Sequence, residues 1–184
     1  MGRLQKSHVT RGAGFFVVAS VLFVLVGGPF DQATAQQQAA CDFLSGAGRI
    51  STTKGSGVAS FSLASGVRQG AFAGHLTYLD SGLTLTVEST KISKYLSTSP
   101  TTRVIEGTAR TNLYGDRSFR VTVTDNEKAG QNDAFQLELD NGYFSQGVLL
   151  SGSVALLKGN RNSKPPSGFT CDKFTTATQK GQAQ

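Results

Sequence analysis

The fold class is decided by Phe119-Arg-Val-Thr-Val-Thr-Asp125, in which apolar and polar residues alternate without interruption. The three apolar residues of this stretch fall on one side of an extended chain, and the polar residues fall on the other. Phe135-Gln-Leu-Glu-Leu-Asp140 and Leu83-Thr-Leu-Thr-Val-Glu88 repeat the arrangement. A period of two is typical of a β-strand with one dry face and one wet face.

Weaker alternation predicts further strands at Arg49–Thr53, Val58–Ala64, Ala71–Leu79, Lys91–Leu96, Arg103–Leu113 and Tyr143–Leu157. Short turns separate several of them: Asp80-Ser81-Gly82, Leu113-Tyr114-Gly115-Asp116 and Asp140-Asn141-Gly142. Connections this short make successive strands antiparallel neighbours. The sequence therefore predicts an all-β antiparallel meander of about eight to ten strands, curled into a closed or flattened barrel, with a β-sandwich as the alternative.

Two irregularities are expected within these strands. The apolar phase slips by one residue between Val87 and Ile92, which predicts a bulge near Ser89-Thr90. Gly152 interrupts the stretch Tyr143–Leu157, which predicts two strands or one strongly bent strand.

Residues 1–35 have the pattern of a signal peptide: a basic start, an apolar run from Phe15 to Val26, and the small residues Ala33-Thr34-Ala35 before Gln36. The apolar run is shorter than the roughly 20 residues of a membrane-spanning helix. We therefore expect export to the cell exterior or envelope and no membrane span after cleavage. Gln38-Ala39-Ala40-Cys41 offers an alternative, a lipoprotein box, although Gln38 stands where such boxes carry an aliphatic residue.

The chain after the leader divides into a β domain over residues 36–157 and a basic tail over residues 158–184. The stretch Cys41–Leu157 has ten basic and ten acidic residues and is neutral. The tail has five basic residues and Asp172 as its one acid. A charge excess confined to a tail does not make a nucleic-acid platform, and we expect no nucleic-acid partner.

Cys41 and Cys171 are the two cysteines of the chain, one near each end of the predicted mature region. In an oxidising compartment an even number of cysteines is best explained by a disulfide. A Cys41–Cys171 bridge would tie the basic tail back to the start of the β domain. Two buried free thiols are the alternative.

Several stretches resemble the post-choice-of-anchor domain, a module of secreted bacterial proteins: Gly46-Ala-Gly-Arg-Ile50, Gly74-His-Leu-Thr-Tyr78, Arg103-Val-Ile-Glu-Gly-Thr-Ala-Arg110, Phe119-Arg-Val-Thr-Val-Thr-Asp-Asn126, Asp133-Ala-Phe135, Asn141-Gly-Tyr143 and Gly147. The resemblance covers about Ser45 to Leu157. It implies a secreted β domain without assigned activity or catalytic residues. The cysteine pair departs from the family's usual pattern.

Most residue types that are typical of catalytic and metal sites are scarce. His75 is the one histidine beyond the predicted leader, so a multi-histidine metal site within one chain is excluded. There is no Gly-x-Ser-x-Gly elbow, and the predicted mature region has no nucleotide-binding glycine motif. We expect no catalytic residues, and we expect His75 to be a rim residue on a strand.

One loop has the composition of a cation site. Asp125-Asn-Glu-Lys-Ala-Gly-Gln-Asn-Asp133 joins two predicted strands, and its hard oxygen ligands suggest calcium as the only cofactor to consider, held by Asp125, Asn126, Glu127 and Asp133. Lys128 in the middle of the loop opposes a cation. Asp and Asn at hairpin ends also cap turns without any metal, and this alternative stays open.

Three functions remain. The leading one is a secreted or surface-associated, non-enzymatic interaction module whose partner is an extracellular protein or polymer. The second is a barrel that carries a small apolar ligand, for which the small residues Ala59, Gly74, Gly107, Ala109 and Gly147 are candidate lumen positions. The third is a hydrolase that uses carboxylates such as Glu88, Glu106 and Glu138, although alternation places Glu138 on a wet face. Composition does not reveal the oligomeric state.

Overall fold

The computed structural model describes residues 38–52, 57–126, 132–157 and 164–171. Their strands form one curled, mostly antiparallel sheet, and none of these residues is helical. The strands are β1 (Gln38–Ala39), β2 (Phe43–Ser51), β3 (Val58–Arg68), β4 (Ala71–Asp80), β5 (Leu85–Ser97), β6 (Thr102–Thr111), β7 (Gly115–Thr124), β8 (Ala134–Leu139), β9 (Phe144–Val148), β10 (Ser151–Leu157) and β11 (Thr170–Cys171).

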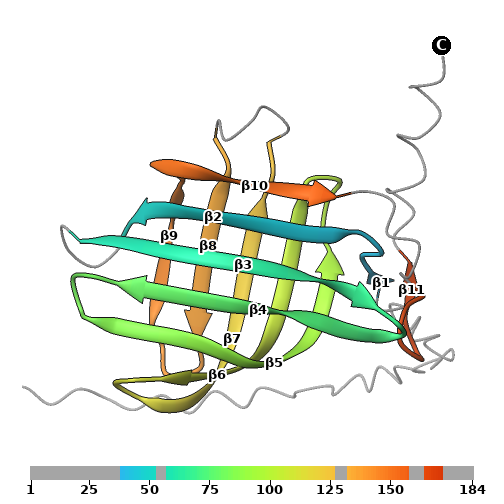
Figure 1. The fold of residues 1–184 in the computed structure, drawn as a ribbon, viewed down its shortest axis with the longest axis horizontal. Coiled ribbons are helices and arrows are strands. Elements are labelled where there is room, and N and C mark those ends of the chain that lie inside the picture. The colour runs from blue at the N-terminus through green and yellow to red at the C-terminus, as the bar shows by residue number, and fades with distance from the viewer. Residues whose placement is uncertain (1–37, 53–56, 127–131, 158–163, 172–184) are drawn as a thin grey trace, which may run out of the picture. The chain divides into compact units, whose positions relative to one another are not determined.

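The sheet order β10-β2-β3-β4-β5-β6-β7-β8-β9 is a meander in which β10 returns to pair with β2. Figure 1 shows two crossed layers, with β10, β2, β3 and β4 in front and β6 to β9 behind. The nine antiparallel strands form a half-barrel, which confirms the predicted all-β, barrel-like meander. β1 and β11 form a small extension that pairs with β5.

β5 is the strand that joins the two layers. Its first residues pair with β4, and its later residues pair with β6. The register shifts between Ser89 and Lys91 and again between Ile92 and Lys94. The bulge predicted near Ser89-Thr90 is therefore present, and it lies where the strand turns from the front layer to the back layer (Figure 1).

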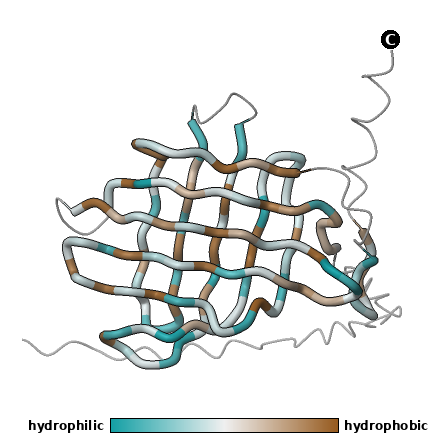
Figure 2. Tube along the Cα trace, viewed as in Figure 1, coloured by the Kyte–Doolittle hydropathy of each residue, from teal (hydrophilic) through white to brown (hydrophobic). Residues whose placement is uncertain are grey.

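The alternating residues that predicted the fold form its core. Val121 of β7 pairs with Leu137 of β8, and both side chains are fully buried. Figure 2 shows apolar and polar positions alternating along the strands of both layers. The period of two therefore predicted the buried face correctly in these three stretches, except at Leu83, which is 39% exposed in the turn before β5.

Several predicted strand boundaries differ from the observed ones; for example, the predicted strands Leu83–Glu88 and Lys91–Leu96 are one strand, β5, which begins at Leu85. β2 begins at Phe43 and not at Arg49. Its glycines have no side chain, so the alternation of apolar and polar residues is not visible in the sequence. A Cβ atom at Gly46 would lie 2.4 Å from a side-chain atom of Val154. The stretch Tyr143–Leu157 forms two strands, as one of the two predicted alternatives has it, but β9 and β10 are separated at Leu149 and Leu150 and not at Gly152. Gly152 lies within β10, where a Cβ atom would lie 2.1 Å from the carbonyl oxygen of Ala47.

Candidate functional site

A buried ion pair lies at the junction of β1 and β2. The Arg103 guanidinium donates from Nη2 to Asp42 Oδ2 at 2.6 Å, and its Nε lies 3.2 Å from both carboxylate oxygens. Tyr95 donates its hydroxyl hydrogen to Asp42 Oδ1 at 2.7 Å. All three side chains are almost fully buried. Buried charges of this kind need a partner, and here each charge has one.

The remaining Arg103 donors are also paired. Its Nη1 donates to the carbonyl oxygens of Ser99 and Thr102 at 2.8 and 2.9 Å, and to the Ser97 hydroxyl at 3.3 Å. Burial raises the pKa of Tyr95 well above its usual value, and the nearby negative charge of Asp42 adds to this. The hydrogen-bonding groups of Arg103, Asp42 and Tyr95 thus bind other groups of the protein, and these contacts stabilise the fold.

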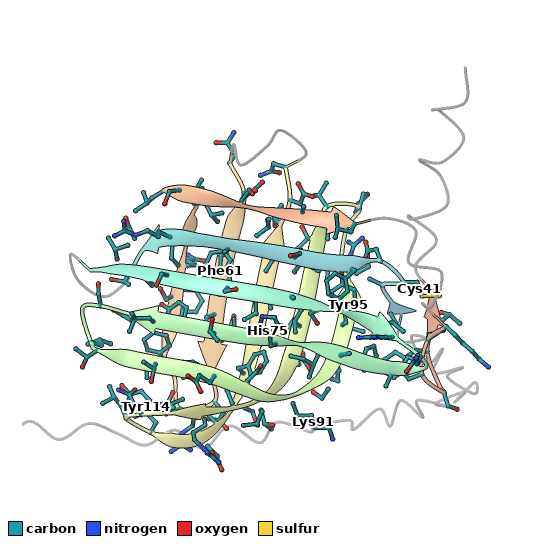
Figure 3. All side chains as sticks on the ribbon, in the orientation of Figure 1. Cys41, Phe61, His75, Lys91, Tyr95 and Tyr114 are labelled. Carbon is teal, nitrogen blue, oxygen red and sulfur yellow. A yellow bond between two sulfur atoms is a disulfide. The ribbon has the colours of Figure 1, made fainter. Side chains whose placement is uncertain are left out.

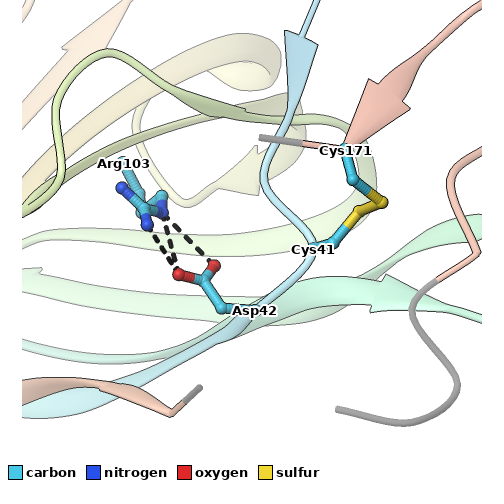
Figure 4. Close-up of a disulfide and its surroundings, with 4 residues drawn as sticks. All are labelled: Cys41, Asp42, Arg103 and Cys171. Carbon is cyan, nitrogen blue, oxygen red and sulfur yellow. Dashed lines mark hydrogen bonds and ion pairs between the residues drawn. A yellow bond between two sulfur atoms is a disulfide. The ribbon is translucent and has the colours of Figure 1, made fainter. Parts of the chain in front are cut away.

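The predicted disulfide joins Cys41 and Cys171, beside this ion pair (Figure 4). Their Cα atoms are 5.3 Å apart, and the bridge spans 130 positions of sequence. A Cys41 sulfur that is bonded to Cys171 is not available to a lipid. The structure thus contradicts the lipoprotein alternative and the alternative of two free thiols.

A second buried polar cluster lies at the other end of β5. Tyr143 donates to Asp80 Oδ2 at 2.8 Å, and its oxygen lies 2.7 Å from the Tyr78 hydroxyl oxygen. Asp80 Oδ1 accepts from the backbone amides of Gly82 and Leu83 in the adjacent turn. Burial, followed by the hydrogen bonds to Tyr78 and Asp80, raises the pKa of Tyr143. A hydroxyl that is held in this protonated form stabilises the turn and does not serve as a base near neutral pH.

Asp133 and Asp125, two of the predicted calcium ligands, bind backbone amides. Asp133 accepts from Asn126 N at 3.0 Å through Oδ1 and from Val154 N at 2.9 Å through Oδ2. Asp125 Oδ2 accepts from Leu156 N at 2.8 Å. Val154 and Leu156 belong to β10, whose other edge pairs with β2. The two carboxylates therefore cap the free edge of β10, where a closed barrel would have a neighbouring strand.

Of the other predicted calcium ligands, Asn126 belongs to the described residues and has a partner within the protein. The Asn126 side-chain amide donates to the carbonyl oxygen of Asn132 and so closes the loop from inside. Glu127 lies outside the described residues. Within the described ranges, no three His, Cys, Asp or Glu side chains gather as a metal ion would require. The geometry shows the turn-capping role that the sequence left open, with Asp125 and Asp133 bound to backbone amides, and the calcium site stays an untested hypothesis.

Aromatic rings fill the space between the two layers. The rings of Phe61 in the front layer and Phe135 in the back layer are stacked with centroids 4.0 Å apart. Tyr78 continues the stack, 6.0 Å from Phe135. This close contact leaves no lumen between the layers at this position.

Two of the small residues considered as lumen positions, Gly74 and Gly107, are small because a neighbouring strand lies close to them. A Cβ atom at Gly107 would lie 2.0 Å from the Lys91 carbonyl oxygen and 2.9 Å from the Phe119 ring. A Cβ atom at Gly74 would lie 2.1 Å from the Ala64 carbonyl oxygen. Both glycines admit a neighbouring strand, and they do not line an empty space.

The outer face of the back layer has a row of alternating charge. Glu106 of β6 accepts from Arg120 of β7 at 2.8 Å and forms an ion pair with Lys94 of β5, also at 2.8 Å. These three side chains border a shallow hollow of about 490 Å³ that opens to solvent over β5 to β8. His75 lies apart from this row, on the outer face of β4, and its side chain is exposed (Figure 3). The structure places His75 where the sequence predicted it.

None of the described residues forms a helix that is long and apolar enough to cross a membrane. Comparison with known proteins found no matching family model, no similar curated protein and no similar solved structure.

Proposed function

We propose that this protein is a secreted or surface-associated interaction module that acts through its outer surface and not through an interior site. The observation that carries the proposal is the close packing between the two layers, where the rings of Phe61 and Phe135 stack directly on each other. The buried carboxylates of Asp42 and Asp80 are hydrogen-bonded within the fold. The ring contacts occupy the described positions between the layers at Phe61 and Phe135, which supports a role for the outer surface over a role for an interior ligand site.

Export and family membership belong to the same proposal. The leader pattern of residues 1–35 and the disulfide are compatible with an oxidising compartment. The resemblance to the post-choice-of-anchor domain supports a role without catalysis. N-terminal sequencing of the exported protein should find Gln36 as its first residue, and an intact Met1 would contradict export.

We assign the contact surface to the hollow bordered by Lys94, Glu106 and Arg120. This hollow presents both signs of charge at once, which favours a polar extracellular protein or polymer with its own fixed charges. Lys94 and Arg120 are half-exposed, so their charge can be changed without disturbing the core.

The test compares Arg120→Glu with Arg110→Glu, a matched charge reversal outside the three-residue row. Each purified variant is incubated with cell envelopes of the producing organism, and the bound fraction is measured at low and at physiological salt. We expect Arg120→Glu to lower binding and Arg110→Glu to leave it unchanged. If both variants bind like the wild type, the hollow is not the contact surface.

A second measurement tests the interior. Native mass spectrometry of the secreted protein should show the mass of the polypeptide alone. A co-purifying apolar molecule that is displaced by a fluorescent fatty acid would restore the carrier function in place of the interaction module.

A further inference from the structure

The two halves of the disulfide are anchored very differently. On the N-terminal side, Ala39, Ala40 and Asp42 are fully buried, and Cys41 is nearly so. The Ala40 amide donates to the Tyr95 carbonyl oxygen at 3.2 Å, and Asp42 is held by Arg103 and Tyr95. This arm is therefore fastened to the fold by contacts that do not involve sulfur.

On the C-terminal side, Thr170 and Cys171 are exposed. We call the described residues 164–171 the C-terminal strap. Its strand β11 pairs with β1 in parallel at two positions, Gln38 with Thr170 and Ala39 with Cys171. The Phe169 ring meets the Phe72 ring edge-on at 5.0 Å, and this half-buried pair connects the strap to the core.

The strand pairing of β11 covers two residues, and the Phe169 ring contact is half-buried, while each ordered residue of the strap loses about 1–2 kcal/mol of backbone entropy. The disulfide lowers this entropy cost, because it keeps the strap close to the position where β11 pairs with β1. The Asp42–Arg103 ion pair gives the N-terminal arm an equivalent anchor of its own. Removing the sulfur bridge should consequently release one arm and leave the other in place.

We propose that the Cys41–Cys171 disulfide is a redox latch that holds the C-terminal strap against the end of the β domain. A dithiol reductant opens the latch: the S–S bond breaks, each cysteine sulfur gains one electron and one proton, and the two thiols of the reductant become a disulfide. The strap then leaves, and Phe72 and the β1 edge that faced β11 become accessible. Residues 39–42 stay bound.

The disulfide also makes the attachment of the strap depend on the redox state of the compartment. This inference rests on the proposed export. Before export the chain is in a reducing environment, where the strap has no covalent hold. Oxidation after export completes the end of the domain. The structural claim about the strap can be tested on purified protein, so its outcome is independent of whether export occurs.

The experiment uses limited digestion with chymotrypsin, which cuts after exposed aromatic residues. Cys171→Ser removes the latch at an exposed position, and Thr170→Ser is the matched control that keeps the disulfide. No reductant is added, because the protease has disulfides of its own. Samples are quenched in acid, reduced and analysed by mass spectrometry to measure cleavage after Phe169.

We expect Cys171→Ser to speed cleavage after Phe169 by about tenfold or more, because local opening exposes the bond to the protease. Cleavage after the core residues Phe61 and Phe135 should be unchanged. Hydrogen exchange should show the Ala40 amide still protected in this variant, and Thr170→Ser should match the wild type.

Two results would overturn the proposal. Equal protection of Phe169 in Cys171→Ser and the wild type would mean that the strap holds itself without sulfur. A parallel rise in cleavage after Phe61, or loss of protection at the Ala40 amide, would mean that the disulfide supports the whole domain and not the strap.

Discussion

Asp42 and Asp80 are both buried, at opposite ends of β5, but their negative charges are compensated in different ways. Asp42 faces the Arg103 guanidinium and is part of an ion pair. Asp80 has neutral partners, the Tyr143 hydroxyl and two backbone amides. An ion pair leaves a second buried charge behind when it is broken, whereas a hydrogen-bonded carboxylate leaves only a polar group. The comparison teaches that similar burial does not imply similar sensitivity to mutation.

Asp133 extends the comparison to a third buried carboxylate. It is 1% exposed, and its partners are the backbone amides of Asn126 and Val154. Its role is to close the edge of β10, which lies far along the chain from the loop that contains Asp133. Mutation at Asp42 is therefore expected to cost more than disturbance of Asp80 or Asp133, whose partners are neutral.

The largest effect should come from Asp42→Asn. The change leaves the Arg103 charge buried without its counter-ion, and we expect the free energy of unfolding to fall by about 3–5 kcal/mol. Urea denaturation measures the loss. The control is Lys94→Gln, which breaks a half-exposed ion pair and should cost about 0–1 kcal/mol. If the two variants lose a similar free energy of unfolding, the buried ion pair is no more important for stability than the half-exposed one.

Tyr143→Phe should have an intermediate effect. It removes the hydroxyl that joins Asp80 to Tyr78, and we expect a loss of about 1–3 kcal/mol, again by urea denaturation. Tyr114→Phe, at the β6–β7 turn, is the control. A cost below that of the control would show that Asp80 is satisfied by its turn amides alone.

The buried tyrosines also predict how stability depends on pH. The pKa values of Tyr78, Tyr95 and Tyr143 are raised in the folded protein, mainly by burial, from an ordinary value of 10.0. Above about pH 10 the unfolded chain loses these protons while the folded chain keeps them. Stability should thus be constant with respect to these groups below pH 10 and fall above it.

Urea denaturation at a series of alkaline pH values, together with phenolate absorbance, measures this loss. Tyr143→Phe should make the decline less steep, because one of the three groups is gone. A decline of unchanged slope would show that Tyr143 ionises alike in the folded and unfolded chains.

Asp133→Ala should cost less than Asp42→Asn, about 1–3 kcal/mol, because the Val154 amide at the edge of β10 and the Asn126 amide lose their acceptor. Hydrogen exchange at the Val154 amide should rise, while the Leu156 amide, which binds Asp125, should change less. Equal increases at both amides would mean that the whole of β10 detaches as a unit.

Calcium should have the smallest effect. Both oxygens of Asp133 and one oxygen of Asp125 already accept amide hydrogens, so millimolar calcium and EDTA should give the same melting temperature. A rise with calcium that Asp133→Asn removes would instead establish the loop as a metal site, since a bound ion stabilises the folded state by mass action.

The sequence by itself determined which residues face inward along the well-patterned strands. The period of two in Phe119–Asp125 and Phe135–Asp140 depends on the geometry of successive residues, so it can be seen locally. The turns at Asp80, Gly115 and Gly142 follow from the same local rules, because their residues set the direction of the chain. The cysteine pairing was predictable because there are two cysteines to pair.

Only the tertiary structure decided the partners of the buried polar residues. Asp42 and Arg103 are 61 positions apart, and Asp80 and Tyr143 are 63 apart, so no local period connects them. Asp125 and Asp133 looked like cation ligands because the sequence places them at two adjacent strand ends. The curl of the sheet brings the unpaired amides of β10 to the same place, and those amides take the carboxylates instead. A buried carboxylate binds the hydrogen-bond donor or positive charge that lies nearest to it in the fold. The course of the whole sheet determines which donor that is.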